Sequence, residues 1–167
     1  MPAEKPFRGL LWSVFLVYAA ILLKLILFKR PFSYIITHFL YHYNSETIAI
    51  NLKRANFIPF HTIQLYLHTK LRAEYSIENL FGNILIFVPL GFLIPLMFAH
   101  TRSSWKIFAV SLLTSLVLET TQLITVLGSF DVDDLMLNTT GGKIGYFAFK
   151  LLHVKSSAKK HPANSLT

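Results

Sequence analysis

The sequence predicts an all-α integral membrane protein: a bundle of about four transmembrane helices, with interfacial or re-entrant segments after the first of them. Hydrophobic residues make up 53% of the chain. Charged residues make up only 14%, whereas soluble domains usually carry about 25%. Several apolar runs are about as long as the roughly 20 residues that a helix needs to cross a bilayer. A chain of 167 residues suffices for one domain. Because the chain is rich in apolar residues and poor in charged ones, a bilayer is its natural solvent.

The first predicted span covers residues 9–28. Lys5 and Arg8 precede it, and Lys29, Arg30 and Pro31 follow it. A basic start before an apolar run is also typical of a secretory signal, but this run has full spanning length and no clear small-x-small cleavage site follows it. We therefore expect an uncleaved first helix.

The second and third predicted spans cover residues 80–99 and 105–127. Pro89 and Pro95 lie inside the second span. Proline removes a backbone hydrogen bond, and membrane helices tolerate this where neighbouring helices satisfy the freed carbonyl groups. A kinked second span could leave a crevice large enough for a lipid.

The fourth predicted span, residues 135–154, is interrupted by polar residues and glycines. Such a helix is stable in a bilayer only when it packs against protein, so we expect it inside the bundle. Gly141 and Gly145 are four residues apart, a spacing that lets two membrane helices approach closely. They could serve packing within the bundle or a homodimer.

Two segments between the first and second spans, residues 31–43 and 56–67, are aromatic and amphipathic but too short to cross. They are expected at the membrane surface or re-entering it. Residues 1–154 are predicted to form a single membrane domain, and residues 155–167 a basic disordered tail.

The formal net charge of +8 is explained by membrane anchoring. The basic residues cluster beside apolar runs, as topology signals do, so the sequence predicts no nucleic-acid partner. The short loop with Arg102 and Lys106 is basic, and the loop after the third span is acidic. We therefore expect both termini in the cytoplasm, although the long segment after the first span is basic and is placed outside.

The predicted spans carry their polar groups in the outward half of the bundle. The candidate ligand-binding residues are Asn79, Asn83, Glu119, Gln122, Asp131, Asp133, Asp134 and Asn138. Glu119 and Lys143 each lie eight residues from a predicted helix end, a depth of about 12 Å. An ion pair between Glu119 and Lys143 is therefore expected.

Simpler roles for these residues remain open. The amides could only join helices, and Asp133 or Asp134 could only cap the fourth helix. Lys24 could extend to the membrane interface. His38 and His42 are four residues apart, but their aromatic surroundings favour an interfacial helix over a metal site. The sequence predicts no cofactor and no metal site, and the absence of cysteine excludes disulfides.

Several motifs together resemble the VanZ-like family, which takes its name from an accessory teicoplanin-resistance protein. The motifs are Asn56-Phe57-Ile58-Pro59-Phe60, residues 79–91 with Asn79, Asn83, Pro89 and Gly91, Glu119-Thr120-Thr121-Gln122, Phe130-Asp131-Val132-Asp133-Asp134, and Asn138-Thr139-Thr140-Gly141-Gly142 with Gly145. The resemblance covers residues 8–152 and implies a small bacterial plasma-membrane protein. It also implies reduced susceptibility to teicoplanin-type lipoglycopeptides. Relatives often carry arginine before the acidic motif, where this chain has Gly128-Ser129-Phe130, and an apolar residue in place of Lys143.

Three functions follow as hypotheses. The first, favoured, is a non-enzymatic protein that binds or shields an amphiphile at the outer leaflet, either a lipoglycopeptide or a lipid-linked cell-wall precursor such as lipid II. The second is an enzyme on a lipid-linked substrate, with Glu119 as general base and the aspartates on Mg²⁺. The third is a small transporter or flippase, which would need a dimer.

Overall fold

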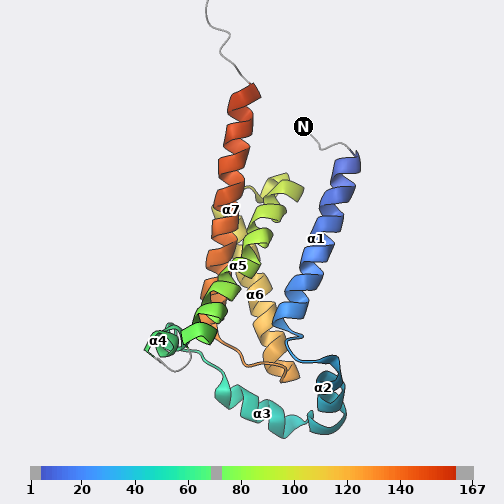
Figure 1. The fold of residues 1–167 in the computed structure, drawn as a ribbon, viewed down its shortest axis with the longest axis vertical. Coiled ribbons are helices and arrows are strands. Elements are labelled where there is room, and N and C mark those ends of the chain that lie inside the picture. Colours follow the sequence, from blue (N-terminus) through green and yellow to red (C-terminus); the bar gives the residue numbers. More distant parts are fainter. Residues whose placement is uncertain (1–4, 69–72, 161–167) are drawn as a thin grey trace, which may run out of the picture.

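The computed structural model describes residues 5–68 and 73–160 of the chain, and these residues form helices joined by short connections (Figure 1). The helices are α1 (Lys5–Ile26), α2 (Phe32–Thr37), the π-helical turn η1 (His38–His42), α3 (Ser45–Arg54), α4 (His61–His68), α5 (Ala73–Met97), the 3₁₀ turn η3 (Ala99–Thr101), α6 (Ser104–Thr125) and α7 (Val132–Lys160). The predicted all-α fold is confirmed over the described residues.

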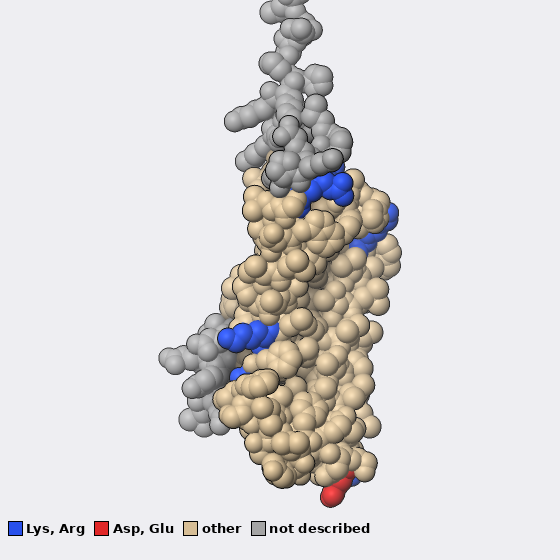
Figure 2. All heavy atoms as spheres, turned by 90° about the vertical axis from the view of Figure 1, so that its right-hand side faces the viewer, with Lys and Arg blue, Asp and Glu red and all other residues tan. Residues whose placement is uncertain are grey.

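Three of these helices are long and apolar enough to cross a membrane: Arg8–Ile26 in α1, Asn79–Met97 in α5, and α6. They coincide with the first three predicted spans. The face of the molecule in Figure 2 is largely free of charged side chains, and its Lys and Arg residues lie toward the upper end and in a second group lower down. The fourth crossing, by α7, stays a prediction, as does the re-entrant character of the short segments.

Close approach of α5 and α7 forms the centre of the bundle. A Cβ atom added at Gly141 would lie 2.0 Å from the carbonyl oxygen of Ile84, and one added at Gly145 would lie 1.9 Å from that of Val88. On the α5 side, a Cβ at Gly91 would lie 1.9 Å from the carbonyl oxygen of Gly142. The glycines therefore serve packing inside the chain, and the Gly141/Gly145 surface offered for a homodimer is covered by α5.

The apolar core lies where α1 and α6 meet α5. Phe87 of α5 and Ile107 of α6 are almost fully buried, and Tyr18 of α1 joins them. The Tyr18 hydroxyl donates a 2.8 Å hydrogen bond to the Ile86 carbonyl of α5. Burying a polar hydroxyl in an apolar core requires such a partner. This bond therefore fixes α1 against the middle of α5.

Helices α2, η1, α3 and α4 lie together at one end of the bundle, while α1 begins and α7 ends at the opposite end (Figure 1). Two side chains attach this group to the end of α6. His38 Nε2 lies 3.0 Å from the Thr125 carbonyl oxygen, and Asn51 Nδ2 donates to the carbonyls of Leu123 and Gly128. The last carbonyls of a helix lack intrahelical partners, so these contacts satisfy the end of α6.

The C-terminal segment differs from its prediction. Helix α7 continues to Lys160 instead of ending at residue 154, so the first part of the predicted disordered tail is helical. The rest of the tail, residues 161–167, lies outside the described residues.

Candidate functional site

The acidic loop between α6 and α7 folds back onto α6. Helix α6 ends at Thr125, and Val126 takes the left-handed conformation with φ of 57°. The chain then returns along α6, so that the backbone N–H of Asp131 donates a 3.0 Å hydrogen bond to Glu119 Oε2. Glu119 is only 2% exposed. The acidic loop therefore meets Glu119 inside the bundle.

Asp131 joins three elements through its carboxylate. Its Oδ1 accepts the backbone N–H of Asp133 at 2.9 Å, the arrangement of a helix N-cap. The same atom accepts Asn56 Nδ2 at 2.9 Å, and Oδ2 accepts the Thr62 hydroxyl at 2.6 Å. Asn56 also pairs with this loop through its backbone, donating to the carbonyl of Phe130 and accepting from Val132. The cap of α7 is thus Asp131, and not Asp133 or Asp134 as the sequence suggested.

Asp133 caps a different helix. Its Oδ1 accepts the backbone N–H of Phe60, and its Oδ2 accepts that of Ile63 at 3.1 Å. Phe60 has a positive φ of 66°, which is rare for an aromatic residue. The fully buried Asp133 carboxylate holds this turn and the start of α4 in place.

Asp134 faces α5. Asn83 Nδ2 donates to Asp134 Oδ1, which joins the middle of α5 to the first turn of α7. Asn79, one helical turn earlier, lies at the surface with its amide 3.5 Å from the Tyr66 hydroxyl of α4. The structure therefore brings Asn83, Asp134, Asp131, Asp133 and Glu119 together, with Asn79 beside them.

The electrostatic environment of this cluster contains one cation that the sequence analysis did not select. Lys29 follows the end of α1 and is close enough to act electrostatically on both Glu119 and Asp134. Glu119, Asp131 and Asp134 repel one another. Because like charges at short range in a low-dielectric site are costly, Lys29 partly offsets the negative charge of the cluster.

The expected ion pair between Glu119 and Lys143 is not formed. Lys143 is exposed, and its Nζ lies over the ring of Phe108, 5.5 Å from the centroid. The depths of Glu119 and Lys143 were estimated on the assumption that the third span ends and the fourth span begins at the same level in the membrane. Because the loop folds back, α7 begins at the level of Glu119, and Lys143 lies about three turns farther along α7.

Two other predicted site residues lie away from the cluster. Gln122 Nε2 donates a 2.9 Å hydrogen bond to the Ile26 carbonyl at the end of α1. Asn138 Nδ2 donates to the Ser115 hydroxyl at 2.9 Å, between α6 and α7. Both contacts join helices, which is the simpler role considered for these amides. Lys24 is exposed on α1.

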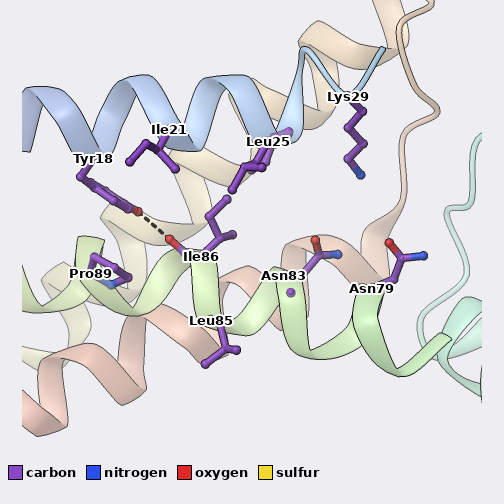
Figure 3. Close-up of a pocket in the computed structure, with 11 residues that line it drawn as sticks. Tyr18, Ile21, Leu25, Lys29, Asn79, Asn83, Leu85, Ile86 and Pro89 are labelled. Atoms are coloured by element: carbon purple, nitrogen blue, oxygen red, sulfur yellow. Dashed lines mark hydrogen bonds between the residues drawn. The ribbon is translucent and has the colours of Figure 1, made fainter. Parts of the chain in front are cut away.

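A groove runs between α1 and α5 beside the cluster (Figure 3). Its volume is about 570 Å³. Its walls are mostly apolar and include Tyr18, Ile21, Leu25, Leu85, Ile86 and Pro89. Lys29, Asn79 and Asn83 lie at one end of the groove, with the Lys29 side chain extending toward the two amides (Figure 3). The groove thus combines an apolar channel with a polar mouth.

Sequence reasoning did not select four residues that the structure places at or beside the cluster. These are Lys29, Asn51, Asn56 and Thr62. Asn56 begins one of the family motifs, but the motif does not indicate which residue it hydrogen-bonds. Asn51 lies in an amphipathic helix, where one buried polar residue is a weak signal. Lys29 was interpreted as a helix-end anchor.

Two comparisons with known proteins address this arrangement. A family model described as VanZ/LLP1 matches residues 15–153. The chain is also 30% identical over 153 residues to "Protein VanZ" of Enterococcus faecium, covering 92% of this chain and 79% of that protein. The chain belongs to the VanZ/LLP1 family.

The VanZ/LLP1 match contains all the residues of the acidic cluster and all the residues that line the groove. Among the described residues, no group of three or more His, Cys, Asp or Glu is arranged to hold a metal ion. No solved structure gives a significant match to the chain.

Proposed function

We propose that the chain holds an amphiphile of the outer leaflet in the groove between α1 and α5, and thereby contributes to teicoplanin-type glycopeptide resistance or to envelope homeostasis. The amphiphile is a lipoglycopeptide or a lipid-linked cell-wall precursor. The observation that carries this proposal is the polar mouth on an apolar channel. An acyl or isoprenoid chain would lie along Ile21, Leu25 and Pro89, and its headgroup would reach Lys29 and Asn83.

The size and chemistry of the groove support a binding role. Small-molecule sites usually measure about 300–1,000 Å³ and have mostly apolar walls with a few polar groups. The groove has a volume of about 570 Å³, its walls are mostly apolar, and its few polar groups lie at the mouth. A membrane-spanning protein would present such a groove directly to lipid, so an amphiphile could enter it from within the bilayer.

The hydrogen bonds of the aspartates favour binding over metal-assisted catalysis. Asp131 accepts from Asn56, Thr62 and the backbone of Asp133, so both of its oxygens already have donors. Both oxygens of Asp133 accept backbone N–H groups. Hard divalent cations take carboxylate oxygens as ligands, and the oxygens of Asp131 and Asp133 already accept the hydrogen bonds that hold the loop.

The proposal includes a location. The chain is proposed to lie in the bacterial plasma membrane, with both termini in the cytoplasm and the mouth of the groove at the outer leaflet. The start of α1 and the end of α7 at one end of the bundle support placing both on the same side of the membrane (Figure 1). Cell-surface labelling of single cysteines is clean in a chain without native cysteine. Labelling of Glu46→Cys from the cytoplasm would contradict the orientation.

The function is tested by filling the groove. Gly82 lines the groove, and a Cβ added there meets nothing within 4 Å. Gly9 is equally open but lies outside the residues that line the groove. We expect Gly82→Phe to abolish the thermal stabilisation of the purified protein by teicoplanin or lipid II, and to fail to restore resistance to a knockout strain. Gly9→Phe should preserve both.

Two results would contradict the proposal. One is that neither lipid II nor teicoplanin shifts the thermal stability of the wild type in nanodiscs. The other is that Gly82→Phe, folded and inserted, behaves like Gly9→Phe in the binding and resistance assays.

A further inference from the structure

A second apolar groove continues the first one along α1 and α5, on the side away from the polar mouth. Its volume is about 470 Å³. It is lined by Val14, Val17, Tyr18, Ile21, Val88, Pro89, Phe92 and Leu93. On α1, residues that line the two grooves follow one another at intervals of three or four, namely Val14, Tyr18, Ile21, Leu25 and Lys29. Residues at this spacing share one helix face, so the two grooves lie end to end on the same side of the α1–α5 pair.

Tyr18 lies at the boundary between the two grooves. Tyr18, Ile21 and Pro89 are the residues that line both. The Tyr18 side chain extends from α1 to α5, where its hydroxyl donates the 2.8 Å hydrogen bond to the Ile86 carbonyl (Figure 3). Tyr18 is 9% exposed, so packing and the hydrogen bond both hold its ring. A hydrocarbon chain that enters from the mouth therefore meets a fixed side chain at the inner end of the first groove.

The distance from the mouth to Tyr18 sets the length of hydrocarbon that the first groove holds. Asn79 and Ile86 are seven residues apart on α5, which corresponds to a rise of about 10 Å. Lys29 and Tyr18 are eleven residues apart, which corresponds to about 16 Å. An extended chain advances roughly 1.2 Å per bond. The first groove therefore matches a straight chain of about 8–13 carbons.

We propose that the groove selects amphiphiles by the length of a single alkyl or acyl chain, and that Tyr18 sets the upper limit at about 13 carbons. This proposal rests on the proposed function and narrows it. The preferred ligand is an amphiphile with a straight chain of medium length, and a long isoprenoid chain is disfavoured.

Packing against the walls, and not transfer out of water, provides the selection. Lipid tails are as apolar as the groove, so a hydrocarbon chain gains no hydrophobic energy by leaving the bilayer for it. Close-packed protein walls give each bound carbon more dispersion contacts than fluid tails do. Carbons beyond Tyr18 lose these contacts and must bend out of the groove, which costs conformational freedom. Binding should therefore strengthen with chain length up to the limit and weaken beyond it.

The test measures chain-length preference with the full chain in nanodiscs. Lysophosphatidylcholines of roughly 8 to 18 carbons share one headgroup, and their binding is compared by native mass spectrometry. The amount bound is normalised to the amount of each lipid in the nanodisc. We expect a maximum at about 10–12 carbons, at least about threefold above the longest lipid. Binding that rises steadily to the longest lipid, or that is independent of chain length, would overturn the proposal.

A matched pair of variants assigns the limit to the boundary between the grooves. Ile21 and Leu25 are both half-exposed residues of α1 that line the first groove, so truncating either leaves the core intact. Ile21 also lines the second groove, and Ile21→Ala should open the boundary and move the maximum to longer lipids. Leu25→Ala should weaken binding at every length without moving the maximum. Identical profiles for the two variants would overturn the proposal.

Tyr18→Phe tests the hydrogen bond that fixes the ring. The replacement keeps the ring but removes the donor to the Ile86 carbonyl. The longest lipid should therefore gain binding severalfold relative to the preferred one. Tyr34→Phe is the control, because Tyr34 is an exposed tyrosine of α2 that does not line either groove. A wild-type profile in folded Tyr18→Phe would overturn the role assigned to Tyr18.

Failure of the chain-length proposal can be separated from failure of the proposed function. If Gly82→Phe removes bound amphiphile while the wild type binds all lengths equally, the groove binds amphiphiles without selecting their length, and the chain-length proposal alone fails. If Gly82→Phe removes nothing, the amphiphile is bound elsewhere, and both proposals fail.

Discussion

Asn83 of α5 donates its side-chain amide to the carboxylate of Asp134 in the first turn of α7. This bond lies beside the contacts of Asp131 and Asp133 to the α3–α4 segment. It therefore links the groove wall to the cluster that holds the α3–α4 segment, and a ligand at Asn83 would act on both.

The first prediction concerns the strength of this link. Asn83→Ala and Asp134→Ala each remove it, and a double-mutant cycle for thermal unfolding in detergent should give a coupling energy of about 1 kcal/mol, as expected for hydrogen bonds between membrane helices. A cycle with Asn79→Ala in place of Asn83→Ala serves as control, because the Asn79 amide lies against Tyr66 and the partner of Asp134 is Asn83. Coupling near zero in the Asn83 cycle would show that the bond is absent in the protein.

The second prediction concerns the cap that Asp133 provides to α4. Asp133→Ala should lower the free energy of unfolding by about 1–2 kcal/mol, because two backbone N–H groups at a helix start lose their acceptor. Hydrogen exchange should accelerate at the amides of Phe60 and Ile63 in particular. Glu46→Ala removes an exposed acidic residue from the first turn of α3 and is the control. Unchanged exchange at Phe60 in Asp133→Ala would contradict the assigned cap.

The third prediction compares the contact of Glu119 with the Asp131 backbone against the ion pair with Lys143 that the sequence suggested. Glu119→Gln should retain the fold, since its side-chain carbonyl can still accept the Asp131 N–H and the mutual repulsion with Asp134 is removed. Glu119→Ala should cost about 1–3 kcal/mol, because a buried donor loses its acceptor. Lys143→Met should change stability by less than about 1 kcal/mol, the range of an exposed cation–π contact. If Lys143→Met destabilised the protein as much as Glu119→Ala, the result would support the Glu119–Lys143 ion pair that the sequence suggested.

The sequence was informative where one physical constraint dominates. Apolar length located the first three long helices, and the glycines at 141 and 145 correctly indicated close helix contact. The acidic motif and Asn83 were selected because polar groups in apolar spans need partners.

The pairing within the site depended on geometry that no local pattern encodes. The left-handed Val126 turns the loop back along α6, which sets the level at which α7 begins and so excludes Lys143. The contacts of Asn56 and Thr62 span more than 60 residues of chain separation. Lys29 resembled any basic residue that ends a span, and only the position of α1 beside α5 places it at the groove.

The last prediction tests the α5–α7 contact. Gly145→Ala places a Cβ atom 1.9 Å from the Val88 carbonyl oxygen, a backbone atom that cannot move without moving α5. Overpacking of this kind typically costs about 1–3 kcal/mol, and thermal unfolding in detergent should detect the loss. Gly9→Ala meets nothing within 4 Å, so it should be neutral or slightly stabilising through the lower entropy of the unfolded chain. If Gly145→Ala unfolded at the wild-type temperature while reducing self-association, the glycines would serve a contact between copies of the chain and not the α5–α7 contact.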